Sequence, residues 1–146
     1  MAPANYNCPG QIVIAGEKAA VEEAIKLADK AGARRALPLA VSAPSHCRLM
    51  EPASKKLSDL LDSIELHTPR IPVVNNADAA FINSVDSIKD SLVRQLNNPL
   101  LWEDSIKLMV ENGIDTFMEV GPKTVLNGLI KRIDRNVRLF NVEDKR

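Results

Sequence analysis

Hydrophobic and polar residues alternate along the chain in blocks that predict strands and helices in turn. The β-branched stretch at residues 11–16 ends at a glycine and is typical of a strand. Over residues 17–31, small and aliphatic side chains recur at helical spacing, and Gly32 stops the pattern. The apolar run at residues 35–42 predicts a second strand. Its Pro38 cannot donate to a ladder, which suggests either an edge strand or a strand whose N–H at this position faces outward.

Beyond Pro44 the predicted helices are longer and the loops less regular. Pro52 belongs in the first turn of the first of these helices, where its missing N–H costs nothing. The pattern predicts a helix over residues 49–64 and a strand over 71–80. A further helix is capped by Asn83 or Ser84 and ends at Pro99. The remaining predicted elements are a helix over 101–111, a strand over 116–120, a helix over 126–133 and a strand over 137–142. Strands alternate with helices, so we predict an α/β fold. The change of pattern near Ser42 suggests a boundary there.

Composition argues against several classes of protein. Nineteen basic and nineteen acidic residues cancel, so no net field attracts nucleic acid or an anionic membrane. No apolar run approaches the roughly 20 residues of a membrane span, and residues 1–10 lack the features of a signal peptide. Cys8 and Cys47 match no metal or CxxC spacing. We therefore expect reduced thiols in a cytoplasmic protein, with neither a metal nor a cofactor.

Two polar residues next to apolar segments are candidates for chemistry. The peptide before Pro44 is biased towards extended geometry, so a stiff turn should hold His46 just ahead of a helix. A histidine there is either a general base or a surface or capping residue. Gln95 falls within roughly 60° of the apolar stripe of its helix. It therefore either joins a structural network or lines a site. The other histidine, His67, is expected in solvent.

Three amides and one cysteine also have two interpretations. Asn5, Asn7 and Gln11 surround the start of a strand, where they either donate to a ligand carbonyl or satisfy turn backbone. Cys47 follows His46 directly. Adjacent residues at a helix start point about 100° apart, which disfavours a cysteine nucleophile paired with this histidine.

The end of the chain is rich in basic residues. The run at residues 131–138, with Lys123 upstream, forms a cationic edge that either meets an acidic partner or is a solvated helix face. A serine nucleophile is harder to find. None of the six glycines begins a G-x-S, so the nucleophile elbow of a serine acyl enzyme is absent from these 146 residues.

Four motifs occur in order along the chain: NYNCPGQIVIAG, SAPSHCRLM, VRQLNNPLLW and FMEVGPKTVLNGLIKRI. Together they resemble the bacterial malonyl-CoA:acyl carrier protein transacylase (FabD) family over essentially all of the chain. The resemblance implies an S-malonyltransferase of fatty-acid synthesis, which moves a malonyl group from malonyl-CoA to the phosphopantetheine thiol of acyl carrier protein. The family chain is about twice as long. Its first half, with the G-H-S-L-G serine elbow and the arginine that grips the malonyl carboxylate, has no counterpart here.

The resemblance implies roles for individual residues. His46 matches the histidine that takes the proton of the serine nucleophile and returns it to the leaving thiol. Gln95 matches the glutamine whose backbone carbonyl orients that imidazole. Asn5 and Asn7 match asparagines near the active-site mouth, and Ser45 lies where related domains vary with the acyl group that they accept.

The resemblance also implies a fold and partners. The fold would be an α/β-hydrolase-like large subdomain with an inserted ferredoxin-like small subdomain. Residues 1–41 would form the second half of the small subdomain, and residues 42–146 the C-terminal part of the large one. The expected partners are malonyl-CoA, acyl carrier protein and the missing N-terminal half of the same enzyme. The candidates for carrier-protein docking are Lys123, Lys131, Arg132 and Arg135. Alone, this chain is expected to be inactive.

Two alternatives stay open. The same motifs occur in acyltransferase domains of polyketide or multi-domain fatty-acid synthases, although an end at Arg146 without a linker favours the free-standing enzyme. The chain is otherwise a non-catalytic fragment that binds acyl carrier protein through its cationic edge.

Overall fold

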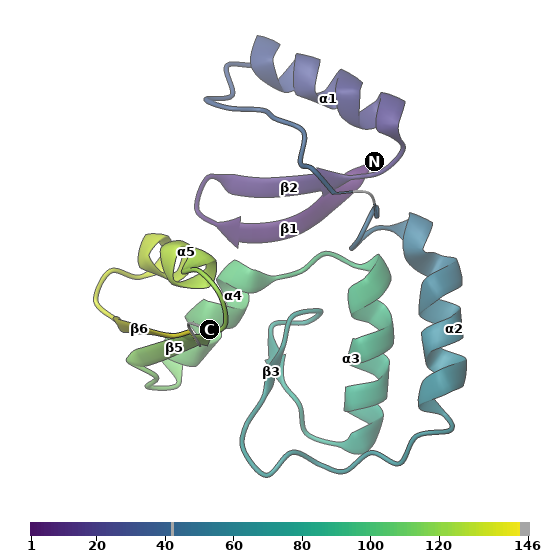
Figure 1. Ribbon diagram of the computed structural model, residues 1–146, viewed down its shortest axis with the longest axis vertical. Helices are drawn as coiled ribbons and strands as arrows, with labels where there is room; N and C mark the ends of the chain where they lie inside the picture. The colour runs from purple at the N-terminus through teal and green to yellow at the C-terminus, as the bar shows by residue number, and fades with distance from the viewer. Residues whose placement is uncertain (42, 144–146) are drawn as a thin grey trace.

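The N-terminal part of the chain is a hairpin followed by a helix. The computed structural model describes residues 1–41 and 43–143. Strand β1 (Ala2–Cys8) pairs antiparallel with β2 (Gln11–Ala15), and α1 (Lys18–Lys30) follows (Figure 1). The structure confirms the predicted β2 and α1. The sequence pattern did not predict β1, because its proline and two asparagines have low strand propensity.

The predicted strand over residues 35–42 is wrong for the residues that the structure describes. Residues 35–41 follow an irregular path without strand pairing, and Ser42 lies outside the described residues. The side chains of Leu37, Leu39 and Val41 are 58%, 58% and 72% exposed. An apolar run becomes a strand only where a neighbouring strand accepts its hydrogen bonds, and among the described residues none pairs with this segment.

Two helices lie side by side in opposite directions in the middle of the chain (Figure 1). A single 3₁₀ turn, η1 (Arg48–Met50), leads into α2 (Glu51–Leu61). Helix α3 (Val85–Asn97) packs against α2. Pro52 lies in the first turn of α2, as predicted. The regular helix is shorter than the predicted span of 49–64, because a 3₁₀ turn forms its start and it ends at Leu61.

Ser84 caps α3 and is one of the two candidates, Asn83 and Ser84, that the sequence offered. Its Oγ accepts a hydrogen bond from the backbone N–H of Ser87 at 3.1 Å, and the Ser87 Oγ accepts one from the N–H of Ser84 at 3.0 Å. This reciprocal pair satisfies two of the amide groups that every helix start leaves without a partner. The helix ends at Asn97, two residues before Pro99.

The predicted strand over residues 71–80 is largely a turn. Only β3 (Val74–Asn75) and β4 (Ala80–Phe81) pair, antiparallel to each other. Between them, the side-chain oxygen of Asn75 accepts hydrogen bonds from the N–H groups of Ala77 and Asp78, at 3.0 and 2.9 Å. Asparagine stabilises turns in this way, which outweighs the apolar character of the segment.

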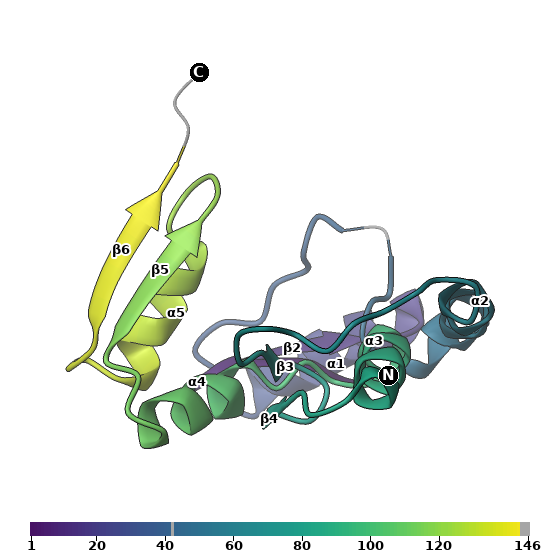
Figure 2. The same ribbon diagram turned by 90° about the horizontal axis from the view of Figure 1, so that it is seen from below.

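The C-terminal part contains a parallel pair of strands. Helix α4 (Trp102–Glu111) leads to β5 (Thr116–Val120), which pairs in parallel with β6 (Arg138–Val142). The crossover helix α5 (Val125–Ile133) lies on one side of this pair (Figure 2). All four elements agree with the predictions from the sequence, and the mixed α/β architecture is confirmed.

A carboxylate on β5 caps α5. Glu119 accepts hydrogen bonds from the backbone N–H groups of Leu126 (3.0 Å) and Asn127 (2.8 Å), in the first turn of α5. A negative group at this position is favourable, because a helix start carries unpaired N–H donors and a partial positive charge. The side chain of Glu119 therefore faces α5. Neighbouring strand residues point the opposite way.

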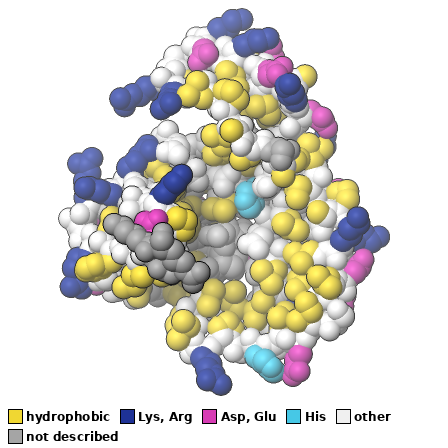
Figure 3. Space-filling model, viewed as in Figure 1, with side chains coloured by type: hydrophobic (Ala, Val, Ile, Leu, Met, Phe, Trp, Pro, Cys, Tyr) yellow, Lys and Arg dark blue, Asp and Glu magenta, His cyan; other side chains and the backbone are white. Residues whose placement is uncertain are grey.

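The opposite face of the parallel pair is apolar and bare. Met118 lies opposite Phe140 and Val120 opposite Val142 in the register. Their exposed fractions are 59%, 51%, 78% and 51% in that order. Few apolar residues are buried in the described part of the chain: Ala4, Cys8, Cys47, Leu61, Ile106 and Ile130. Figure 3 shows hydrophobic side chains spread over much of one face of the molecule.

Candidate functional site

His46 lies in the turn between the irregular segment and η1, where the sequence predicted it. Its backbone φ is +62°, in the left-handed region. A residue with a Cβ pays about 1–2 kcal/mol for this conformation. The turn is therefore maintained by contacts that offset this strain.

Two of these contacts join His46 to the C-terminal end of α3. The imidazole Nδ1 lies 2.6 Å from the backbone oxygen of Gln95. The backbone N–H of His46 donates to the oxygen of Leu96 at 3.0 Å. The last carbonyl groups of a helix have no partner within the helix. His46 thus satisfies two of them, which fixes both its backbone and its ring.

The contact with Gln95 determines which ring nitrogen carries the proton. A backbone carbonyl only accepts hydrogen bonds, so Nδ1–H of His46 is the donor. The neutral ring then has its free lone pair on Nε2, which is the form that accepts a proton from a nucleophile. Periodicity placed the side chain of Gln95 near the apolar stripe, whereas the family resemblance implied a contact through its backbone carbonyl, which is the contact that the structure contains.

A buried hydroxyl links α2 to the same part of α3. The Oγ of Ser54, a side chain of a residue that is only 5% exposed, donates to the backbone oxygen of Val93 at 2.9 Å. Ser54 was not singled out from the sequence. A polar residue three positions before Leu57 and seven before Leu61 on an apolar stripe is the signal that would have identified it.

An ion pair links α3 to the turn between β3 and β4. The guanidinium of Arg94 contacts both carboxylate oxygens of Asp78, at 2.5 and 2.6 Å, and also contacts Asp90. Hydrogen bonds from Arg94 hold the pKa of the Asp78 carboxyl below its usual range, and the two carboxylates raise the pKa of Arg94. Arg94 directly precedes Gln95, so this pair holds the helix end that contacts His46. The sequence analysis also missed it.

Strand β1 lies beside the segment that follows α3. The N–H of Tyr6 donates to the oxygen of Leu100 at 2.9 Å, and the N–H of Leu100 donates to the oxygen of Ala4 at 2.8 Å. Asn5 therefore lies in a short bridge to the α3–α4 connection, and Asn7 lies further along the same strand. Both are half-buried. Tertiary structure brings β1 and the end of α3 together across many residues of sequence.

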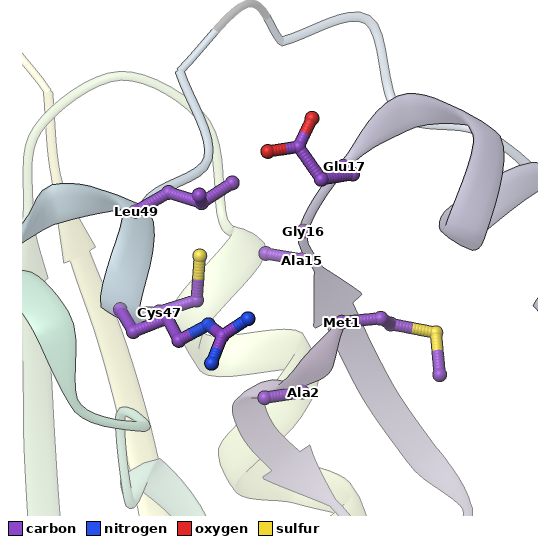
Figure 4. Close-up of a pocket in the computed structure, with 8 residues that line it drawn as sticks. Met1, Ala2, Ala15, Gly16, Glu17, Cys47 and Leu49 are labelled. Carbon is purple, nitrogen blue, oxygen red and sulfur yellow. The ribbon is translucent and has the colours of Figure 1, made fainter.

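A pocket of about 300 Å³ lies next to the His46 turn. Figure 4 shows Cys47 and Leu49 on one side of it and Ala15, Glu17 and Met1 on the other. Its lining residues are Met1, Ala2, Ala15, Gly16, Glu17, Cys47, Arg48 and Leu49. The pocket thus lies between the open end of the β1–β2 hairpin and the segment that contains Cys47 and η1. Ser45, directly before His46, is exposed.

Both cysteines are buried free thiols. The Sγ of Cys47 donates to the backbone oxygen of Pro44 at 3.1 Å. Burial raises the pKa of the Cys8 thiol, against the opposing effect of the positive charge on Arg132. In the described part of the chain, no group of three or more His, Cys, Asp or Glu residues is arranged to hold a metal ion. No described helix is long and apolar enough to cross a membrane.

The four basic candidates differ in their contacts. Arg132 donates to the side-chain oxygen of Gln11 at 2.5 Å and to the backbone oxygen of Pro9 at 3.0 Å, so it joins α5 to the β1–β2 turn. Lys123 lies in the β5–α5 loop with φ of +71°. It is exposed, as are the other two candidates, Lys131 and Arg135.

Comparison with known proteins identifies the family. A model of the acyl transferase domain matches residues 1–142. The chain belongs to the acyl transferase domain family. The resemblance that four motifs indicated is thereby confirmed.

Relatives of this acyl transferase domain are malonyl CoA-acyl carrier protein transacylases. That of Haemophilus influenzae is 49% identical over 140 residues, which are 96% of this chain and 45% of the relative. That of Escherichia coli strain K12 is 52% identical over 133 residues, which are 91% of this chain and 43% of the relative. The chain spans less than half the length of these relatives.

Solved structures give the same picture. A malonyl-transacylase in complex with a type II PKS acyl-carrier protein is 50% identical, with a TM-score of 0.95 over 98% of this chain and 46% of its own. An acyl carrier protein S-malonyltransferase from Vibrio cholerae is 46% identical, with a TM-score of 0.95 over 99% and 47%. The acyl transferase domain seen here therefore has the fold of one part of these enzymes.

Proposed function

We propose that this chain is the histidine-bearing part of a malonyl-CoA:acyl carrier protein transacylase. The whole enzyme would transfer a malonyl group from CoA to the thiol of the carrier protein. The names of the relatives support this reaction. The observation that carries it is the 2.6 Å contact between Nδ1 of His46 and the backbone oxygen of Gln95, since it leaves Nε2 free to act as a base.

In the proposed reaction, His46 moves one proton in each half. A serine hydroxyl from outside these 146 residues attacks the thioester carbonyl of malonyl-CoA while Nε2 of His46 takes its proton. The carbon–sulfur bond breaks, and the imidazolium returns the proton to the departing CoA thiol. The carrier-protein thiol then loses its proton to His46 and attacks the malonyl-serine ester, and the serine oxygen recovers that proton.

The helix end that contacts His46 suits this role. The C-terminal end of a helix carries a partial negative charge, which stabilises a cation held against it. The carbonyl of Gln95 therefore replaces the carboxylate of a serine hydrolase: it fixes the ring tautomer and stabilises the imidazolium less strongly than a full charge. A weaker acceptor fits a transfer between two thioesters of similar energy.

The remaining residues have secondary roles in this proposal. Asn5 and Asn7, on the strand that reaches the end of α3, would hold the substrate. The exposed Ser45 would shape the space for the acyl group. Lys123 and Lys131, together with Arg135, would attract the acidic carrier protein. Arg132 belongs to the same edge, but its hydrogen bonds to the β1–β2 turn make it primarily an anchor of α5.

The proposal extends to the subdomains. Residues 1–41, with their antiparallel hairpin and α1, would form the second half of a ferredoxin-like small subdomain. Residues 42–146 would form the C-terminal part of an α/β-hydrolase-like large subdomain. The different strand pairing supports this division, since β1–β2 is antiparallel and β5–β6 is parallel.

The bare face of the β5–β6 sheet supports a longer working protein. A folded monomer of this mass exposes about 7,400 Å², whereas this chain exposes 10337 Å². Parallel sheets are normally covered on both faces. We therefore propose that the rest of the transacylase, the part that supplies the serine, packs on the face formed by Met118, Val120, Phe140 and Val142. A domain of a larger synthase would satisfy the same geometry.

One experiment tests the proposed activity. In the longer protein, His46→Ala should lower the rate of malonyl transfer by about 10²–10⁴-fold, the usual contribution of a general base. The matched control is His67→Ala, because the side chain of His67 is 80% exposed and lies outside this site. Near-normal transfer by His46→Ala would make His46 a structural residue.

The 146-residue chain provides a second readout. Incubated with malonyl-CoA and analysed by intact mass, it should carry no covalent malonyl group. Stable malonylation would contradict the assignment of the nucleophile to another segment. Carrier-protein binding by this chain, lost in high salt, would instead favour a non-catalytic docking module that uses the exposed lysines of the cationic edge.

A further inference from the structure

We infer that Cys47 is a positioning residue, whose buried thiol holds the His46 turn in the conformation that directs Nδ1 to Gln95. The inference gains its catalytic meaning from the proposed function of His46. The observation behind it is the hydrogen bond from Sγ of Cys47 to the backbone oxygen of Pro44 at 3.1 Å. That bond spans the turn that contains His46.

The thiol occupies a place that a backbone amide often takes. In a four-residue turn, the N–H of the last residue commonly donates to the carbonyl of the first. Among the described residues, the backbone hydrogen bonds include none from Cys47 N–H to the Pro44 carbonyl. Cys47 instead has extended backbone angles, φ −144° and ψ 168°, and its side chain closes the turn. The left-handed φ of His46 lies inside this closure.

Burial of Cys47 favours the hydrogen bond from its thiol to the Pro44 carbonyl. Cys47 is only 4% exposed, so its thiol has little access to water as an alternative partner. Its backbone carbonyl accepts a hydrogen bond from Met50 N–H at 2.9 Å, which fixes Cys47 to the 3₁₀ turn. The turn is thus held at three points: the thiol closes it, η1 anchors its end, and the end of α3 binds His46.

The same geometry argues against the reactive interpretation of the Cys47–His46 pair. The Cys47 thiol donates to the Pro44 carbonyl, and among the hydrogen bonds of the described residues none joins it to a ring nitrogen of His46. A thiol nucleophile needs a base that removes its proton. Here the thiol donates to a carbonyl, so its contribution is to position the ring.

The tautomer of His46 tests the inference directly in the 146-residue chain. The chain has two histidines, so ¹⁵N spectra of the imidazoles give two sets of signals, with the solvent-exposed His67 as internal reference. We expect His46 to carry its proton on Nδ1. Cys47→Ala should convert a measurable fraction of His46 to the Nε2–H form. Cys47→Ser, which restores a donor of similar size, should recover the original signals.

Cys8→Ala is the matched control. Cys8 is also a buried free cysteine, at 2% exposure, but its thiol contacts the side chain of Gln11 at 3.8 Å, away from the His46 turn. It should leave the His46 signals unchanged. An unchanged Nδ1–H signature in Cys47→Ala, with the fold intact, would overturn the inference and reduce Cys47 to a space-filling residue.

A second measurement does not depend on the folding of Cys47→Ala. In the Cys8→Ala variant, the only S–H stretching band belongs to Cys47. A band shifted to lower frequency than that of a free thiol supports a hydrogen bond to the Pro44 carbonyl, and an unshifted band contradicts it. In the transacylase, Cys47→Ala should lower kcat by about tenfold with little change in KM, because misplacement of the base affects the chemical step.

The inference and the proposed function fail separately. If Cys47→Ala changes the tautomer while His46→Ala leaves transfer intact, the positioning is real and the catalytic role is wrong. If the tautomer is unchanged in Cys47→Ala but His46→Ala is inactive, the catalytic role stands without this support.

Discussion

The His46 turn and the β5–β6 sheet differ in how completely this chain stabilises them. Around His46, several polar groups of the turn, α2 and α3 find partners within the chain, including the backbone oxygens of Gln95 and Val93. The β5–β6 pair has a capped helix on one face and a bare apolar surface on the other. The hydrogen bonds around His46 need only segments that this chain contains, whereas a parallel sheet needs material on both faces. The orientation of the His46 imidazole can therefore be fixed in a chain whose sheet is incomplete.

The largest expected effect on stability comes from a comparison of a buried apolar residue with a residue on the bare face of the β5–β6 sheet. Ile106, on α4, is 0% exposed, and Ile106→Ala should lower the free energy of unfolding by about 2–5 kcal/mol because it leaves a cavity. Val120→Ala shortens a side chain that is 78% exposed, and it should change the free energy of unfolding by less than about 0.5 kcal/mol. Urea denaturation of the 146-residue chain measures both.

Equal losses of unfolding free energy in these two variants would contradict the contrast between the buried Ile106 and the bare face that contains Val120. They would mean that the face with Val120 is already covered in solution. Repeating the denaturation at tenfold lower protein concentration identifies a second copy as the cover, since the stability of a dimer depends on concentration.

A smaller effect tests the hydrogen-bonded side of the comparison. Asp78→Asn should lower the free energy of unfolding at pH 7 by about 0.5–1 kcal/mol, the range for partly exposed ion pairs that solvent screens. The pKa of Asp78 is depressed in the folded state, chiefly by hydrogen bonds from Arg94. Its contribution is therefore present above the unfolded pKa of about 3.9 and is lost as pH falls through the lower folded pKa.

Denaturation at pH 7 and pH 3 checks this sign. The difference between the native chain and Asp78→Asn should shrink on acidification. Asp59→Asn, at an exposed position of α2, serves as control and should cost little at either pH. A difference that grows at low pH would show that the ion pair with Arg94 does not stabilise the fold.

The smallest effect concerns backbone strain in the β5–α5 loop. Lys123 has φ of +71°, so Lys123→Gly relieves about 1–2 kcal/mol of left-handed strain and loses about 0.5–1 kcal/mol through glycine flexibility. We expect a net gain of about 0.5 kcal/mol in thermal or urea denaturation. The same replacement inside α1, Lys26→Gly, should cost about 1 kcal/mol. A loss in both variants would contradict the strain at Lys123.

Prediction from the sequence succeeded where the local pattern was strong. The apolar stripe of α3, its cap at Ser84 and the strand β5 were identified because their periodicity and end signals are contained in adjacent residues. It failed at residues 35–41 and 71–80, where apolar runs were taken as strands. Strand pairing depends on a partner elsewhere in the chain, and the Asn75 turn competes with it.

Prediction of the site from the sequence also succeeded for some residues and failed for others. The motif around His46 and its match to Gln95 came from the order of residues along the chain, and their catalytic roles stay predictions. The sequence did not indicate that Ser54 binds the carbonyl of Val93, or that Arg132 is held by the β1–β2 turn. Both contacts join residues that are distant in sequence, so no pattern of neighbouring residues indicates them.

By itself, the sequence determined the helices, the β5 and β6 segments and the membership of an acyl transferase family, because each depends on residue order and periodicity. Only the tertiary structure decided that β5 and β6 pair in parallel with one face bare, and that His46 adopts a left-handed backbone against the end of α3. The physical reason is that hydrogen-bond partners and covered faces are supplied by distant segments, which the folded chain alone brings together.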